Sequence, residues 1–189
     1  MATAELKEPV ILFPMTSERF CNLPISERFK LELLNGEVYV AARPAPTHQH
    51  FVFQLALVIE LWIKARKLGR ILLDTLMKLD SRWTPAPDLC FLATKNLHRV
   101  QKKRIVGPVD LAVEVISSRR KNVDRVKKLA AYGRFGVAWY WIVDLERREL
   151  EEYCLEDRGY VKVAAVSFDQ VFMPRLFPGL RINLASLEW

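Results

Sequence analysis

The first half of the chain alternates between short apolar runs typical of strands and one long apolar helix. Residues 29–42 contain two strand-like runs around Asn35 and Gly36, a dipeptide that favours the left-handed conformation at both central positions of a tight hairpin turn. Residues 47–68 are apolar on most sides of a predicted helix, so we expect this helix to be buried on more than one face, in part by another subunit. The other elements expected in this half are a short helix over 16–23 and strands over 71–79 and 88–93.

The second half of the chain combines strands with one further helix. Residues 138–143 are apolar at every position, which is typical of a central strand covered on both faces. A helix over 123–135 is expected to end at Gly136, because glycine readily adopts the left-handed conformation that follows a helix end. Further strands are expected over 110–116, 149–155 and 160–165. This order predicts an α/β (α+β) fold, in which a mixed β-sheet is flanked by helices and preceded by an N-terminal β-hairpin.

Length and composition place the chain among ordinary globular proteins. Its 189 residues suit a single domain over 1–189, and 51% of them are apolar. Cys21, Cys90 and Cys154 are widely separated, so neither a zinc site nor a disulfide framework is supported, and a reducing compartment is indicated. The N-terminus lacks a signal-peptide pattern, and no uncharged stretch is long enough to span a membrane. We therefore expect a cytoplasmic protein without membrane association.

Positive charge is concentrated in one segment of the chain. Between Lys95 and Arg134 there are twelve Lys or Arg residues and three acidic ones, a balance of 12 − 3 = +9 that leaves −2 for the rest of the total of +7. Such a segment is expected on a surface that binds polyanions, because neutralising phosphates releases counterions. From charge alone, a solvated basic loop explains the segment equally well.

Two carboxylates in predicted neighbouring strands suggest a metal site. Asp88 opens one strand, and Glu114 lies within the next one among apolar residues, where an unpaired charge would be costly. Carboxylates placed in this way bind one or two Mg²⁺ ions in phosphodiester hydrolysis, and the ions lower the pKa of the attacking water. Asp88 also suits a turn after Pro87, so the sequence pattern alone leaves a structural explanation open for it.

A cation is also needed at such a site, and the simplest pattern places a lysine two residues after the glutamate on the same strand face. That position is Ile116, so the simple pattern fails. The helix that follows has Asp124, Lys128 and Tyr132 at positions i, i+4 and i+8, and we expect it to direct Lys128 to the site. An ordinary surface ion pair with Asp124 is the alternative role for Lys128.

Short segments throughout the chain resemble one known family. In this order and spacing they are similar to the Uma-type family of the PD-(D/E)XK nuclease superfamily, whose members are described as putative restriction endonucleases. The chain departs from the family pattern at residues 117–120, where Ser-Ser-Arg-Arg replaces a Ser-Pro-Ser-Thr type of turn, and at Ala138, where an acidic residue is frequent. The similar segments are LELLNGEVYV (31–40), PAPTHQH (44–50), APDLCFL (86–92), DLAVEVIS (110–117), DRVKKLAAY (124–132), GVAWYWIVD (136–144) and FPGL (177–180).

This resemblance implies a restriction-endonuclease-like core in which Asp88 and Glu114 bind Mg²⁺ or Mn²⁺. It also implies that the catalytic lysine has moved from the strand to the helix, as Lys128. The resulting hypothesis is a homodimeric endonuclease that hydrolyses DNA. Alternatives are a non-catalytic nucleic-acid-binding or structural protein on a nuclease fold, and an enzyme that acts on RNA. Supporting roles are expected for Glu32, His48, Gln49, Asp124 and Tyr132, and nucleic-acid contacts for Lys102, Lys103, Arg104, Arg119, Arg120 and Lys121.

Overall fold

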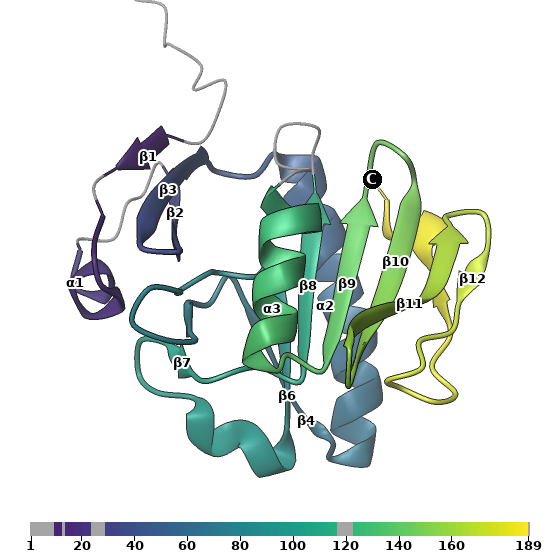
Figure 1. Ribbon diagram of the computed structural model, residues 1–189. Coiled ribbons are helices and arrows are strands. Elements are labelled where there is room, and N and C mark those ends of the chain that lie inside the picture. Colours follow the sequence, from purple (N-terminus) through teal and green to yellow (C-terminus); the bar gives the residue numbers. More distant parts are fainter. Residues whose placement is uncertain (1–9, 13, 24–28, 117–122, 189) are drawn as a thin grey trace, which may run out of the picture.

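The fold is built around a mixed six-stranded β-sheet (Figure 1). The computed structural model describes residues 10–12, 14–23, 29–116 and 123–188. The strand order is β11-β10-β9-β8-β6-β4, in which β8 and β9 are parallel and the other neighbours are antiparallel. The predicted mixed sheet is therefore confirmed. Its strands are β4 (Gly69–Leu73), β6 (Leu89–Ala93), β8 (Leu111–Ile116), β9 (Trp139–Asp144), β10 (Glu149–Glu156) and β11 (Gly159–Ser167).

Helices cover both faces of this sheet (Figure 1). Helix α2 (Pro46–Arg66) packs against one face, whereas the π-helix η2 (Val123–Lys128) continues into α3 (Leu129–Phe135) on the other. Strand β9 contributes alternate side chains to the two cores, with Trp141 on the α2 side and Tyr140 on the α3 side. It is the buried central strand that its uniform apolar pattern predicts. The C-terminal elements β12 (Val171–Phe172), β13 (Ile182–Asn183) and η3 (Leu184–Leu187) add to the core on the α2 side.

A second, smaller sheet lies at the N-terminal end of the molecule. Asn35 and Gly36, with φ of 56° and 82°, form the predicted turn of the hairpin. The backbones of Leu33 and Thr84 exchange two hydrogen bonds, of 3.0 and 2.8 Å, which hold the hairpin beside the segment that leads to Asp88. This attachment brings the hairpin to one end of the large sheet. The elements are β1 (Val10–Leu12), α1 (Ser17–Cys21), β2 (Phe29–Leu34) and β3 (Glu37–Ala42), with sheet order β1-β3-β2.

Two expected elements differ from those in the structure. The predicted strand over 71–79 is interrupted at Asp74, which has φ of 42° and therefore cannot continue an extended strand. The chain then forms the short strand β5 (Met77–Lys78), which pairs with β7 (Ile105–Val106) after the 3-10 helix η1 (Thr94–Arg99). The predicted helix over 123–135 is continuous, but its first part is a π-helix, and it ends as expected at Gly136, with φ of 82°.

Helix α2 is buried on one face and exposes an apolar stripe on another. The side chains of Phe53, Leu57 and Leu61 are 56%, 42% and 62% exposed, at a spacing of four residues. The expectation that this helix is buried on more than one face is therefore wrong for the isolated chain. Coverage by another subunit stays a prediction. Within the described part of the chain, no helix combines the length and the apolar character needed to cross a membrane.

Candidate active site

Of the two predicted metal-binding carboxylates, Glu114 lies on β8 and Asp88 directly precedes the neighbouring strand β6. In the antiparallel pairing of β6 and β8, Leu89 is opposite Val113, so Asp88 and Glu114 are the next residues beyond this pair. The Asp88 carboxylate also accepts a hydrogen bond from the backbone N–H of Val115, with an Oδ2 to N distance of 2.9 Å. The sheet therefore brings Asp88 to the strand end that carries Glu114.

Glu114 is held by two side chains from the helix on the same face of the sheet. Its Oε1 atom accepts hydrogen bonds from Lys128 Nζ at 2.8 Å and from Tyr132 Oη at 2.9 Å. Lys128 and Tyr132 are one helical turn apart, so they reach the same oxygen. The structure thus brings together Glu114, Lys128 and Tyr132, whereas the side chain of Asp124 lies outside the described part of the chain.

Glu32 reaches the same lysine from the hairpin. Lys128 Nζ is 2.8 Å from Glu32 Oε1, and that oxygen also accepts a hydrogen bond from the backbone N–H of Ala86 at 2.9 Å. Lys128 and Glu32 are fully buried. One buried ammonium therefore joins a carboxylate of the hairpin to a carboxylate of the large sheet.

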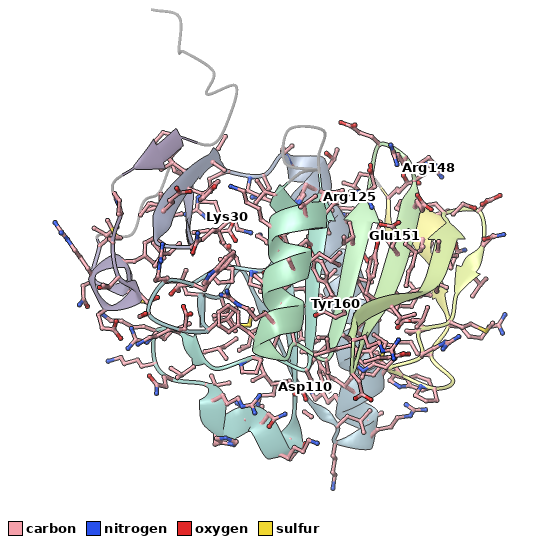
Figure 2. All side chains as sticks on the ribbon, viewed as in Figure 1. Lys30, Asp110, Arg125, Arg148, Glu151 and Tyr160 are labelled. Atoms are coloured by element: carbon pink, nitrogen blue, oxygen red, sulfur yellow. The ribbon has the colours of Figure 1, made fainter. Side chains whose placement is uncertain are left out.

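Lys30, which was not among the residues predicted from the sequence, also reaches the site. Its Nζ atom is 2.7 Å from Asp88 Oδ1, and in Figure 2 the residue lies between the hairpin and α3. Lys30 is two residues before Glu32 on β2, so both side chains point to the same face of the strand. This spacing is the signal that could have identified it, because a lysine and a glutamate on one face of a strand with apolar neighbours need charged partners.

Helix η2, which carries Lys128, is itself anchored by ion pairs. Arg125 contacts the carboxylate of Glu151 on β10, and its Nη2 atom is 3.5 Å from Asp144 Oδ2 (Figure 2). Asp144 is fully buried, and Glu151 is 5% exposed. These contacts fix the helix over the sheet next to the strand end where Glu114 lies, and so they position Lys128.

His48 is the other predicted residue that reaches the site. Its Nε2 atom lies 2.8 Å from the carbonyl oxygen of Val115 and 3.3 Å from Asp88 Oδ2. A carbonyl oxygen only accepts hydrogen bonds, so Nε2 carries the proton and is not free to bind a metal ion. Gln49 is exposed on α2, and no contact among the described residues joins it to the site. Arg119, Arg120 and Lys121 lie outside the described residues.

The electrostatic environment keeps Asp88 ionised. Burial raises the pKa of its carboxyl, but the charge of Lys30 and the hydrogen bonds from His48 and Lys30 lower that pKa far more, to well below its usual range. Burial lowers the pKa of Lys30, yet the nearby carboxylates of Asp88, Glu32 and Glu114 raise it above its usual value. Burial and the adjacent Glu114 raise the pKa of Tyr132 well above 10.0, so its hydroxyl remains a hydrogen-bond donor.

The donor atoms of this site fit a hard divalent cation. We define the buried ionic cluster as Lys30, Glu32, Asp88, Glu114 and Lys128, which contains three carboxylates and two ammonium groups. Its formal charge is therefore 2 − 3 = −1. Among the described residues, no group of three or more His, Cys, Asp or Glu side chains is arranged to hold a metal ion. Mg²⁺ commonly uses only one or two carboxylates together with water and substrate phosphate, so Asp88 and Glu114 are the residues that would hold it.

Replacing Lys30 by methionine tests the coupling between Lys30 and Asp88. Loss of the ammonium leaves Asp88 buried without its main counter-charge, so the free energy of unfolding is expected to fall by about 3 kcal/mol at pH 7. A pKa that folding lowers stabilises the protein above the ordinary value of 3.8, and this contribution is lost as pH falls through the folded pKa. The difference between wild type and variant should therefore narrow from pH 7 towards pH 3. Urea denaturation at several pH values measures it.

The matched control is Lys64→Met, because Lys64 is exposed on α2. Its substitution is expected to change the unfolding free energy by less than about 0.5 kcal/mol, with the same small value at each pH. A Lys30→Met difference that stays constant over this pH range would contradict the proposed coupling.

Comparisons with known proteins identify the family. A family model described as "Uma2: Putative restriction endonuclease" matches residues 17–185. A crystal structure of a putative nuclease belonging to DUF820 from Anabaena variabilis ATCC 29413 superposes with a TM-score of 0.76 and 17% sequence identity. That similarity covers 92% of this chain and 97% of the other, and at this identity it shows a shared fold.

A more distant structural similarity is to the type IIG restriction endonuclease BpuSI. Its TM-score is 0.42 at 11% identity, with 65% of this chain and 14% of the other covered, which is too weak to support an argument. A search of curated proteins found no match. The family model, however, spans most of the chain, and the predicted family and fold are confirmed. The chain belongs to the Uma2 family, which is described as a family of putative restriction endonucleases.

Proposed function

We propose that the protein is a divalent-metal-dependent nuclease that hydrolyses phosphodiester bonds of DNA. The observation that carries this proposal is the hydrogen bond from the Val115 N–H to Asp88, which holds Asp88 next to Glu114 and beside two buried lysines. Membership in a family of putative restriction endonucleases supports the same reaction class. Mg²⁺ or Mn²⁺ bound there would lower the pKa of a water molecule and offset negative charge on the phosphate.

The residues of the cluster have distinct roles in this proposal. Asp88 and Glu114 hold the cation, and Asp88 is suited to this because its low pKa keeps it ionised. Lys128, predicted to be the catalytic lysine, has no solvent exposure, so in this proposal it holds Glu114 in place together with Tyr132. Lys30, whose side chain is 4% exposed, holds Asp88 and is the lysine of the cluster that also lines a surface pocket.

The basic residues of the loop before β7 suit a DNA substrate. Lys102 and Lys103 are exposed, and with Arg104 they line the same pocket as Lys30. Such groups contact phosphates without reading the base sequence. The proposal includes a homodimer, in which two sites cut the two strands of a duplex and the exposed stripe of Phe53, Leu57 and Leu61 is buried.

Cleavage assays with defined metals test this function. Purified protein is incubated with supercoiled plasmid and linear DNA in Mg²⁺, in Mn²⁺ or in EDTA. Cleavage is expected with metal and not with EDTA, and Asp88→Asn is expected to be at least about 100-fold slower. Matched RNA should remain intact. If wild type leaves all DNA uncut, or if Asp88→Asn cuts as fast as wild type, the proposal is wrong.

A non-catalytic DNA-binding role is the second candidate. It is favoured by one observation, namely that Asp88 and Glu114 already contact the ammonium groups of Lys30 and Lys128. A cluster neutralised in this way is also what a purely structural site would need. DNA binding that persists in EDTA with a steep salt dependence, without cleavage in either metal, would favour this role.

A further inference from the structure

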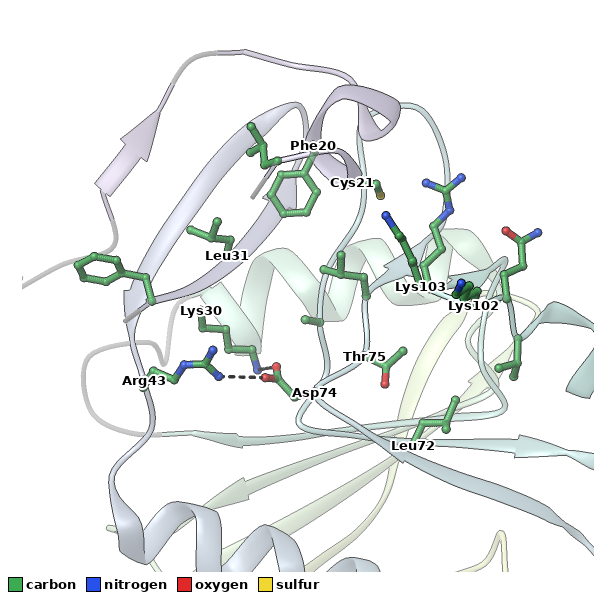
Figure 3. Close-up of a pocket in the computed structure, with 17 residues that line it drawn as sticks. Phe20, Cys21, Lys30, Leu31, Arg43, Leu72, Asp74, Thr75, Lys102 and Lys103 are labelled. Atoms are coloured by element: carbon green, nitrogen blue, oxygen red, sulfur yellow. Dashed lines mark ion pairs between the residues drawn. The ribbon is translucent and has the colours of Figure 1, made fainter. Parts of the chain in front are cut away.

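A pocket of about 640 Å³ lies beside the candidate active site (Figure 3). It is formed by α1 and β2 on one side, by the segment between β4 and β5 on another, and by the basic loop before β7. The three walls come from parts of the chain that are far apart in sequence. The pocket therefore exists only because the hairpin is attached to the end of the large sheet.

The charges that line the pocket are predominantly positive. Five cationic side chains line it, compared with one carboxylate, that of Asp74. Asp74 is 3.6 Å from Lys30 Nζ and 3.8 Å from an Arg43 nitrogen, so cations already surround it, as the dashed lines in Figure 3 show. With a formal lining charge of 5 − 1 = +4, the pocket favours an anionic ligand. The five cationic residues are Lys30, Arg43, Lys102, Lys103 and Arg104.

The rest of the lining is largely apolar and includes two aromatic rings. Phe20 and Phe29 line the pocket together with leucines from the segment after α1, from β2 and from the β4 region. Figure 3 shows Phe20 and Leu31 on the side opposite Leu72 and Thr75. Apolar and aromatic walls between cationic ends suit a ligand with flat apolar faces and charged flanks. Nucleotides have this character, since bases stack on aromatic side chains while phosphates meet Lys and Arg.

Lys30 links this pocket to the active site. It lines the pocket, and its Nζ atom is 2.7 Å from Asp88. A strand whose reacting phosphate lies beside Asp88 therefore has its neighbouring nucleotides next to the pocket. Lys102 and Lys103 project into the same space from the other wall, where they are placed to meet further phosphates of that strand (Figure 3).

The size of the pocket distinguishes unpaired from paired DNA. The pocket volume of about 640 Å³ is far smaller than a DNA duplex, whose major groove alone is about 12 Å wide. A duplex therefore does not enter the pocket. The volume of the pocket lies within the range of pockets that bind small organic ligands. Unpaired nucleotides fit these dimensions.

We propose that this pocket binds unpaired DNA nucleotides that flank the phosphate bound beside Asp88. This inference rests on the proposed nuclease function and specifies its substrate as DNA with a single-stranded portion, such as an overhang, a flap or a bubble. The protein binds such DNA more tightly than a blunt duplex. Its cleavage sites then lie next to the junction between paired and unpaired DNA.

Binding in EDTA tests the pocket independently of cleavage. The probe is a fluorescein-labelled thymidylate oligonucleotide of about 12 nucleotides, and fluorescence anisotropy gives its Kd at several salt concentrations. We expect binding at least 10-fold tighter than to a blunt duplex of equal length. In Lys102→Ala/Lys103→Ala, the slope of log Kd against log salt should decrease by about 1.4, the value for two lost contacts to single-stranded phosphates.

The matched control is Lys64→Ala/Lys95→Ala, which removes the same charge at two exposed positions outside the pocket. This control should keep the wild-type slope. Thr75→Trp places a large ring into the pocket from the β4–β5 segment, and it should weaken oligonucleotide binding at least 10-fold without changing duplex binding. The thermal unfolding midpoint of each variant establishes that it is folded.

The outcomes separate this inference from the proposed function. The first outcome is selective oligonucleotide binding that depends on Lys102, Lys103 and Thr75, without cleavage of any DNA. It would support the proposed nucleotide-binding pocket and contradict the proposed nuclease function. Metal-dependent cleavage with equal affinity for blunt duplex and oligonucleotide would support the proposed nuclease function and contradict the proposed nucleotide-binding pocket. Equal effects of the pocket and control variants, or tighter binding of a matched RNA oligonucleotide, would also overturn the inference.

Discussion

Glu114→Gln is expected to reduce metal-dependent DNA cleavage by about 100- to 1,000-fold, the cost of losing one electrostatic stabiliser at a reacting phosphate. The substitution preserves the shape of the side chain, so Lys128 and Tyr132 keep an oxygen to which they donate at this position. It removes the negative charge that the proposed site uses to hold Mg²⁺ or Mn²⁺. Single-turnover cleavage measures the loss of rate, and calorimetric titration with each metal measures the loss of metal affinity.

The matched control for this variant is Glu152→Gln. Glu152 is also a fully buried glutamate of the large sheet, but it accepts hydrogen bonds from Trp141 Nε1 at 3.1 Å and from the backbone N–H of Arg175, in the core on the α2 side. Burial raises the pKa of its carboxyl, so a neutral amide suits this position. Its cleavage rate and metal affinity should match wild type. If Glu114→Gln also cuts and binds metal like wild type, Glu114 is not a metal ligand.

Lys128→Met is expected to cause the largest loss of stability, about 3–5 kcal/mol in the free energy of unfolding. The substitution leaves the carboxylates of Glu32 and Glu114 buried without the ammonium that lies 2.8 Å from each of them. Denaturation by urea, followed by circular dichroism, measures this loss. In Lys128→Met/Glu32→Gln one of the two charges is also removed, so part of the stability should return.

The adjacent residue Lys127 provides the control for this variant. Lys127 is exposed and contacts only the hydroxyl and ring of Tyr39 among the described interactions, so Lys127→Met should cost less than about 1 kcal/mol. A Lys128→Met protein as stable as Lys127→Met would contradict the proposed structural role of the buried ammonium. Failure of the double variant to regain stability would show that Glu32 and Lys128 are not energetically coupled.

The stability of the buried ionic cluster and its proposed function are connected. A closed set of three carboxylates and two ammonium groups is held at the end of the sheet, and a cation at Asp88 and Glu114 changes its formal charge from −1 to +1. Since metal that binds the folded state alone raises its apparent stability, Mg²⁺ or Mn²⁺ should raise the unfolding midpoint of wild type and have less effect on Glu114→Gln.

Several local features follow from the sequence. The Asn35-Gly36 turn, the helix end at Gly136 and the doubly covered strand β9 were all predicted, because each depends on residues that are close along the chain. The fold class also followed, since the order of helices and strands restricts the possible layers. The strand break at Asp74 was not predicted, because its left-handed backbone depends on contacts with distant residues such as Asp88, whose carbonyl accepts the Asp74 N–H.

For the candidate site too, some features follow from the sequence and others only from the tertiary structure. The sequence by itself indicated Glu114 because a charge within an apolar run needs a partner, and it indicated Asp88 and Lys128 by their spacing and family resemblance. Only the tertiary structure decided which partners they have: Lys30 for Asp88, and Glu32 for Lys128. The physical reason is the distance along the chain over which each kind of interaction acts. Backbone preferences act over a few residues, whereas these pairs are 58 and 96 positions apart and meet only after the hairpin docks onto the large sheet.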